Sequence, residues 1–219
     1  NFNSRLVLFR HSKKNLSGYW QNMNKSAYRI PLDLKFGYTT RFTVSKGEIN
    51  HLSEKYEVTF NPQNEDTYKS VGLFNSAGIE VSGTFLTETG DYRFLDGNRS
   101  GDSLFLSCFD GSHAFLFKAK VYSDSINGEF LSGKHWKGKW NGRVNPTYEL
   151  THPDSLTYVV NEVPFSFTMP DLDSTIFTFP NNHFENKVTI IQIMGTWCPN
   201  CMDETKFLSG YYNKNKSRG

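Results

Sequence analysis

The stretch SLFLSCFDGSHAFLFKAKVYSDSINGEFL, residues 103–131, decides the fold. It contains three short runs rich in Phe, Leu, Val and Ile, at 103–109, 114–122 and 126–131. Asp110-Gly111-Ser112 separates the first two runs, and Asn127-Gly128 lies near the second junction. A glycine beside a small polar residue supplies the positive φ that a tight hairpin requires. The stretch therefore predicts consecutive antiparallel hairpins.

The same alternation of apolar run and turn continues on both sides of this stretch. Similar turn signals occur at Thr89-Gly90-Asp91, Asp96-Gly97-Asn98 and Ser132-Gly133-Lys134. Strands at intervals of about 8–12 residues indicate a meander, and closure into a barrel would remove its exposed edges. We therefore expect residues 1–145 to form an antiparallel β-barrel or a curved sandwich. The further strands expected are 6–10, 28–34, 41–44, 56–60, 70–74, 79–87, 91–95 and 135–141.

The pattern changes after residue 145. Residues 146–164 contain three prolines and no sustained periodicity, which is typical of an ordered linker. Residues 188–194, VTIIQIM, predict a β-strand, and a helix is expected from near Cys198 to about Tyr211. Because β followed by βα differs from the preceding meander, we expect residues 165–219 to form the N-terminal part of a separate α/β domain.

Composition narrows the classes of function. A formal net charge of only +2, with both signs interspersed, gives no electrostatic footprint for nucleic acid. The longest apolar run is about seven residues, short of the roughly 20 that a membrane-spanning helix needs. No signal-peptide pattern opens the chain, and Asn1 in place of Met indicates a trimmed N-terminus. Three cysteines, two of them close together, exclude a framework of structural disulfides.

The strongest functional signal is Trp197-Cys198-Pro199-Asn200-Cys201, directly after the predicted strand 188–194. Two cysteines three residues apart at the start of a helix lie on one face, within bonding distance of each other. The first thiol also lies at the helix N-terminus, where unpaired N–H groups stabilise a thiolate. Pro199 suits the first helical turn because the N–H that it lacks would have no partner there. The segment predicts a dithiol site for disulfide exchange.

Other interpretations of these cysteines stay open. Cys-x-x-Cys is also half of a zinc site, but Cys108 is far upstream and no histidine follows Cys201 within ten residues. A surface pair without function and a buried structural thiol at Cys198 are further alternatives. Since the strand and helix context favours redox chemistry, no metal site and no cofactor are expected.

The remaining candidates have ordinary structural interpretations. Cys108 shares parity with two leucines on one predicted strand, so we expect a small buried side chain rather than a third redox thiol. His113 and His135 lie beside turns and are expected to be hydrogen-bonded or exposed to solvent. Trp136 and Trp140 share a strand face, where core packing is expected.

Residues 187–204, KVTIIQIMGTWCPNCMDE, resemble the active-site segment of TlpA/ResA-type thioredoxin-fold proteins. The shared pattern is a Lys-led apolar strand, a small residue, Thr or Ser, Trp-Cys-x-x-Cys, and a Glu three residues later. Residues 165–172 and 176–179 are similar to the short strands that open this domain. Residues 83–117 resemble the β-rich domain that precedes it in one TlpA-like subgroup.

The resemblance implies roles for individual residues. Cys198 would be the attacking thiolate, Cys201 the resolving thiol, and Trp197 and Pro199 would orient the substrate. The glutamate matching Glu204 helps to move protons in the family, although the helix dipole alone would also favour an acidic residue there. Disulfide-bearing or dithiol proteins would be the substrates. An extracytoplasmic location, the periplasm, and a membrane-side electron donor are implied as well.

The sequence departs from the family pattern in two places. Lys206 stands where the family usually has Pro, and the chain ends at Gly219, before the further strands, the closing helix and the cis-proline loop of a thioredoxin fold. The thioredoxin-like domain is therefore expected to be incomplete and a poor catalyst. The competing interpretation is a β-barrel module that binds a ligand or partner, with a redox-incompetent thioredoxin fragment attached.

Overall fold

The computed structural model describes residues 3–25, 27–37, 40–45, 50–111, 113–160, 163–196 and 198–218. The chain divides into two compact units, Asn1–Leu156 and Thr157–Gly219. The division lies inside the segment 146–164 for which the sequence predicts a linker, and which includes the short helix α1 (Pro153–Leu156). The predicted domain boundaries at 145 and 165 stay predictions.

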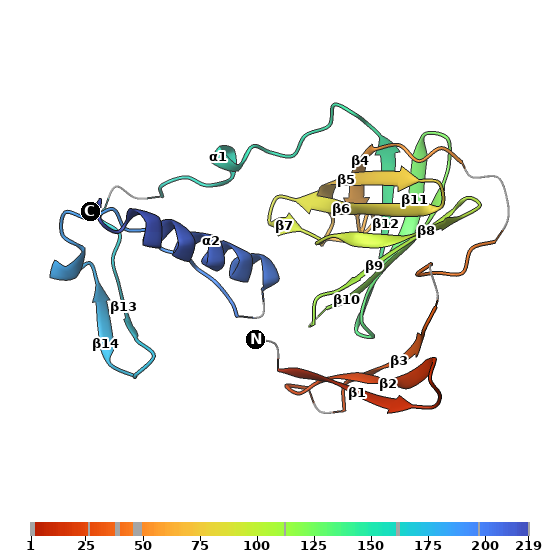
Figure 1. Ribbon diagram of the computed structural model, residues 1–219. Helices are drawn as coiled ribbons and strands as arrows, with labels where there is room; N and C mark the ends of the chain where they lie inside the picture. The colour runs from red at the N-terminus through yellow and green to blue at the C-terminus, as the bar shows by residue number, and fades with distance from the viewer. Residues whose placement is uncertain are drawn as a thin grey trace. The chain divides into compact units, whose positions relative to one another are not determined.

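Eight antiparallel strands of the first unit form a closed β-barrel (Figure 1). Around the barrel the strand order is β5-β4-β12-β11-β10-β9-β8-β6. The pairing of β5 with β6 closes the ring. β12 pairs with β4, with Val144 opposite Tyr56. The predicted antiparallel barrel is confirmed for residues 55–144, while the strands before residue 55 form a separate sheet. Its strands are β4 (Lys55–Phe60), β5 (Tyr68–Ala77), β6 (Glu80–Thr87), β8 (Leu95–Ser100), β9 (Ser103–Phe109), β10 (Ala114–Val121), β11 (Ser125–Ser132) and β12 (Trp136–Val144), with the two-residue β7 (Gly90–Asp91) beside β6.

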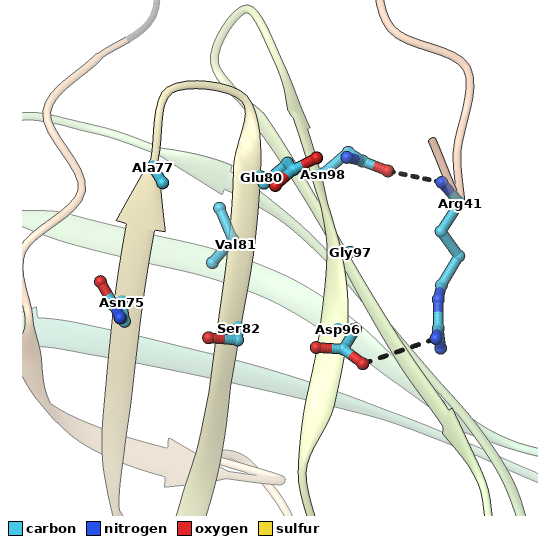
Figure 2. Close-up of a pocket in the computed structure, with 9 residues that line it drawn as sticks. All are labelled: Arg41, Asn75, Ala77, Glu80, Val81, Ser82, Asp96, Gly97 and Asn98. Carbon is cyan, nitrogen blue, oxygen red and sulfur yellow. Dashed lines mark hydrogen bonds and ion pairs between the residues drawn. The ribbon is translucent and has the colours of Figure 1, made fainter. Parts of the chain in front are cut away.

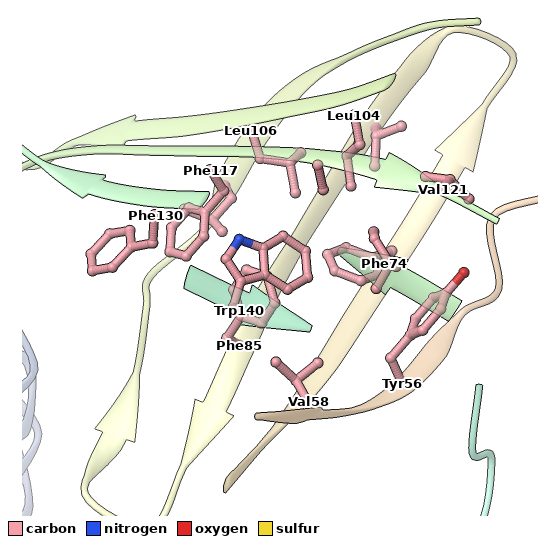
Figure 3. Close-up of a cluster of buried hydrophobic side chains, with 14 of the residues drawn as sticks. Tyr56, Val58, Phe74, Phe85, Leu104, Leu106, Phe117, Val121, Phe130 and Trp140 are labelled. Atoms are coloured by element: carbon pink, nitrogen blue, oxygen red, sulfur yellow. The ribbon is translucent and has the colours of Figure 1, made fainter. Parts of the chain in front are cut away.

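Alternate residues of the strands fill the barrel with aromatic and aliphatic side chains (Figure 3). The ring of Phe117 stacks on Phe130 at 4.5 Å and on Phe85 at 4.8 Å between centroids. Phe60 and Trp140 are each 1 % exposed. Burying one such side chain contributes roughly 1.5–3 kcal/mol relative to leaving it exposed, so this cluster holds the barrel together. The barrel interior is a packed core.

Two predictions for β11 and β12 are wrong in instructive ways. Asn127-Gly128, predicted to lie near a turn, is inside β11, where Gly128 faces Trp140 of β12. A Cβ at Gly128 would stand 2.7 Å from the indole of Trp140, so the glycine serves close approach rather than a turn. Trp136 shares a strand with Trp140 but is 44 % exposed at the end of β12, outside the core.

The sequence also misplaces strand boundaries around β8. Asp96-Gly97-Asn98, predicted to be a turn, is part of β8, while of the predicted strand 91–95 only Asp91 and Leu95 belong to strands. A Cβ at Gly97 would lie 1.7 Å from the carbonyl oxygen of Phe105, so the strand needs a glycine there. Residues 41–44 form no strand; the N–H groups of Arg41 and Phe42 donate to the Asn98 side chain instead.

A second sheet of three antiparallel strands precedes the barrel: β1 (Ser4–Arg10), β2 (Asn15–Asn22) and β3 (Arg29–Lys35). β2 was not predicted, because NLSGYWQN is largely polar. Trp20 of β2 is 4 % exposed; its ring contacts Phe109 edge-on at 5.9 Å, and its indole N–H donates to the carbonyl oxygen of Gly111. These contacts connect the small sheet to the β9–β10 turn of the barrel.

The second unit contains a hairpin and a helix. β13 (Phe167–Pro170) pairs with β14 (Ile176–Phe179), followed by the 3₁₀ turn η1 (Asn182–Phe184) and α2 (Pro199–Asn215). α2 begins where the sequence predicts, continues through Lys206 and extends four residues beyond Tyr211.

Residues 188–194 form no strand, contrary to prediction. A strand needs a neighbour with which to exchange backbone hydrogen bonds, and the described part of the second unit provides none for this segment. Four of its apolar side chains are more than 40 % exposed: Val188, Ile190, Ile191 and Ile193. An α/β thioredoxin-like sheet is therefore not present among the described residues.

Candidate functional site

Cys198 caps the N-terminus of α2. Its backbone is extended (φ −95°, ψ 108°), and its sulfur accepts a hydrogen bond from the backbone N–H of Cys201 at 3.3 Å. Pro199 follows in the first turn, as predicted, where no N–H is needed. The Cys201 N–H and the N-terminus of α2 both lie at this sulfur, an arrangement that in general stabilises a thiolate.

Cys201 lies one turn inside the helix, and both thiols are free and partly buried. The hydrogen bond between the two cysteines raises the pKa of the Cys201 thiol, with a smaller contribution from burial, while a backbone hydrogen bond at Gly195 opposes the shift. Deprotonation of Cys201 is therefore less favourable than that of an isolated thiol.

A side-chain network connects the segment before the helix to the turn that carries Cys201. The Gln192 amide nitrogen lies 3.2 Å from the Cys201 carbonyl oxygen and 2.9 Å from Oε2 of Glu204. The Thr205 hydroxyl lies 2.9 Å from Oε1 of Gln192 and 2.8 Å from the Cys201 carbonyl oxygen. The structure thus brings Glu204 onto the helix face of Cys201. Gln192 and Thr205 were missed, because neither residue type signals redox chemistry.

The remaining predicted residues have simple environments. Trp197 lies outside the described residues. Cys108 lies on β9, partly buried against the core, and burial raises the pKa of its thiol to about 11. The sequence predicts a small buried side chain here, and the structure places Cys108 half-buried against the core.

Both barrel histidines are hydrogen-bonded. His113 Nδ1 lies 2.9 Å from Oδ2 of Asp110, and His135 Nδ1 lies 2.9 Å from the hydroxyl of Tyr28. Burial lowers the pKa of His135, helped by the charges of Lys25 and His113. Among the described residues, no group of three or more His, Cys, Asp or Glu side chains could hold a metal ion.

One charged side chain lies within the barrel wall. Arg99 of β8 is 3 % exposed, and its Nε and Nη2 atoms have no hydrogen-bond partner among the described residues. Burial lowers the pKa of Arg99, while the nearby Tyr56 opposes the shift.

A polar hollow of about 400 Å³ lies beside β5, β6 and β8 (Figure 2). Its lining includes Arg41, Glu80, Ser82 and Asp96, and Arg41 Nη2 lies 3.5 Å from Oδ2 of Asp96. Sequence reasoning could not find it, because the segment at Arg41 meets two strands far along the chain.

The second unit has a larger, mainly apolar hollow of about 690 Å³ between α2 and the segment that precedes it. Val188, Ile190 and Leu208 contribute apolar surface, and Lys187 and Lys216 lie among its basic residues. Part of its wall is therefore formed by the exposed apolar side chains of residues 188–194.

Comparison with protein-family models finds none that matches the chain, and comparisons with curated proteins and with solved structures find no match either. No helix in the described ranges is long and apolar enough to cross a membrane.

Proposed function

We propose that this protein is a thiol-disulfide oxidoreductase that acts on protein disulfides through Cys198 and Cys201. The observation that carries the proposal is the hydrogen bond from the Cys201 N–H to the Cys198 sulfur at the start of α2. A surface pair without function would not need a helix N-terminus at one sulfur and a raised pKa at the other. The resemblance to TlpA/ResA-type proteins supports the same chemistry.

The exchange proceeds in two balanced steps. The Cys198 thiolate attacks one sulfur of a substrate disulfide, forming a mixed disulfide and releasing the other substrate sulfur as a thiolate. Cys201 then attacks the Cys198 sulfur, the Cys198–Cys201 disulfide forms, and the second substrate sulfur leaves. Two electrons pass to the substrate, and Glu204, one turn beyond Cys201, receives the proton that Cys201 loses. The reverse sequence oxidises a substrate dithiol.

The other parts of the chain have supporting roles in this proposal. Trp197 and Pro199, the neighbours of Cys198 in the sequence, orient the substrate, and the barrel tethers or selects the partner protein. Residues 165–219 are the N-terminal part of a thioredoxin-like domain, and α2, with its N-cap, carries its two cysteines. An extracytoplasmic location, the periplasm, and a membrane-side electron donor complete the proposal by family resemblance.

Trapping of the mixed disulfide tests the proposal. With Cys201 replaced by serine, the full chain should form a covalent adduct with a disulfide-bearing probe protein such as insulin, because the resolving step is blocked. Cys198→Ser should abolish the adduct, and Cys108→Ser should leave it unchanged. An adduct that maps to Cys108, or none in the Cys201→Ser protein, would contradict the proposal.

A second candidate function is that the barrel binds a small ligand or a partner. The observation in its favour is the polar hollow beside Arg41 and Asp96. Because aromatic side chains fill the interior, binding would occur at this hollow rather than inside the barrel. A fragment screen by NMR, compared between the parent chain and Arg41→Ala, would detect such a site.

A further inference from the structure

Both the nitrogen and the oxygen of the Gln192 side-chain amide form hydrogen bonds with residues of α2. Its nitrogen donates to the Cys201 carbonyl oxygen and to the Glu204 carboxylate, and its oxygen accepts from the Thr205 hydroxyl. The described structure shows no strand pairing for the surrounding segment 187–196, so this side chain is a major link between the segment and the dithiol turn.

The chemistry of the partners fixes the orientation of the amide. A carbonyl and a carboxylate oxygen can only accept, so the atom that faces them must be the NH₂ group. An amide turned by 180° would place Oε1 against two acceptors and lose both hydrogen bonds. Gln192 therefore cannot rotate without a cost, and it holds Glu204 in one place.

Gln192 acts where the second cysteine reacts. Cys201, Glu204 and Thr205 lie on one face of α2, since residues three and four apart are neighbours on a helix. The single proton of the Thr205 hydroxyl is shared between Oε1 of Gln192 at 2.9 Å and the Cys201 carbonyl oxygen at 2.8 Å, so two side chains contact this turn. Without Gln192, Glu204 would be a surface carboxylate free to change rotamer.

We propose that Gln192 is a positioning residue of the dithiol, which holds Glu204 and the Cys201 turn in the geometry in which Cys201 resolves a mixed disulfide. This inference rests on the proposed function and adds a residue to it. It predicts that Gln192 affects the second step of the exchange and leaves the first attack by Cys198 nearly unchanged, because none of its hydrogen bonds reaches Cys198.

The two steps can be separated with 5,5′-dithiobis(2-nitrobenzoate) in the Cys108→Ser background. Attack by Cys198 releases one thionitrobenzoate and leaves a mixed disulfide; attack by Cys201 on the Cys198 sulfur releases the second. Gln192→Leu should slow the second release about tenfold, which is less than the roughly hundredfold that a 1 Å misplacement at a reacting centre can cost. The first release should change less than twofold. Thr189→Val is the matched control, because Thr189 lies on the same segment without a side-chain hydrogen bond in the described structure.

Two further variants test the route of the effect. Thr205→Val, which frees Oε1 of Gln192, should slow the second release in the same direction. In a Glu204→Gln background, Gln192→Leu should slow the second release less than it does in the parent, because the effects of residues that act together are not additive.

The outcomes separate the two proposals. A parent chain that never gives a second release contradicts the proposed exchange chemistry and the role of Gln192 with it. The role of Gln192 alone is overturned if the parent gives a normal second release and Gln192→Leu does not change its rate. It is also overturned if Gln192→Leu slows both releases equally. If Gln192→Leu slows the second release as much in the Glu204→Gln background as in the parent, Gln192 does not act through Glu204.

Discussion

The backbone N–H of Cys201 points at the sulfur of Cys198 across 3.3 Å, so the first turn of α2 stabilises charge on one thiol of the pair. A separate hydrogen bond, between the two thiol side chains, raises the pKa of Cys201. A helix N-terminus thereby makes two chemically identical side chains unequal.

The two cysteines should differ in their rate of alkylation. Iodoacetamide at neutral pH is expected to label Cys198 first, because the thiolate is the reactive form and Cys201 is held protonated. Mass spectrometry of peptides from a time course would locate the adducts. Cys201→Ser serves as a control that should still be labelled at Cys198, and earlier labelling of Cys201 would reverse the assigned roles.

Cys108 should make stability depend on pH in the alkaline range. Its pKa is raised from the ordinary 9.0 to about 11 by burial, so the folded state holds a proton that the unfolded state releases. The associated stability is present below about pH 9 and is lost as the pH rises toward about 11. The difference in unfolding free energy between the parent and Cys108→Ala should shift over this window. A pH-independent difference would contradict the burial of the thiol.

The aromatic core should dominate the stability of the barrel. Phe117→Ala is expected to lower the free energy of unfolding by about 3–5 kcal/mol, because it removes a ring stacked between Phe85 and Phe130. Phe94→Ala is the matched control: Phe94 is 91 % exposed, so its loss should change stability by less than about 0.5 kcal/mol. Urea denaturation followed by tryptophan fluorescence measures both, and similar losses would show that the interior is not packed as described.

Alanine substitutions at two glycines should show which glycine is needed for close packing of neighbouring atoms and which is not. Gly128→Ala is expected to destabilise the barrel by about 1–3 kcal/mol, since its Cβ would meet the Lys118 carbonyl oxygen at 2.3 Å and the Trp140 indole at 2.7 Å. Gly210→Ala, in α2 with nothing near its Cβ, should be neutral or stabilising by up to about 1 kcal/mol. Thermal unfolding by circular dichroism compares the two, and a harmless Gly128→Ala would refute the contact with Trp140.

The barrel could be predicted because each strand is marked by local sequence features, namely alternating apolar residues and glycine-containing turns. The sequence failed where a distant contact decides the structure. β2 is polar but buries Trp20 against Phe109, and Asp96-Gly97-Asn98 looks like a turn but fits a crowded strand position at Phe105. Residues 188–194 have strand-forming side chains, yet a strand also needs a partner.

In the candidate site, too, local features could be predicted from the sequence, whereas contacts between distant residues could not. The Cys-x-x-Cys motif and the start of α2 follow from adjacent residues, and the sequence locates both. The hydrogen bonds of Gln192 depend on how an extended segment lies against a helix, which no local pattern specifies. The hollow beside Arg41 likewise combines segments distant in the chain.

The pairing of β4 with β12 has a consequence for synthesis on the ribosome. Tyr56 leaves the exit tunnel well before Val144, its partner in the closed barrel. At about 5–20 residues per second, the nascent chain carries one edge of β4 unpaired for a period on the order of ten seconds. An unpaired edge is where nascent chains associate wrongly, so this interval is when the protein most needs protection by a chaperone.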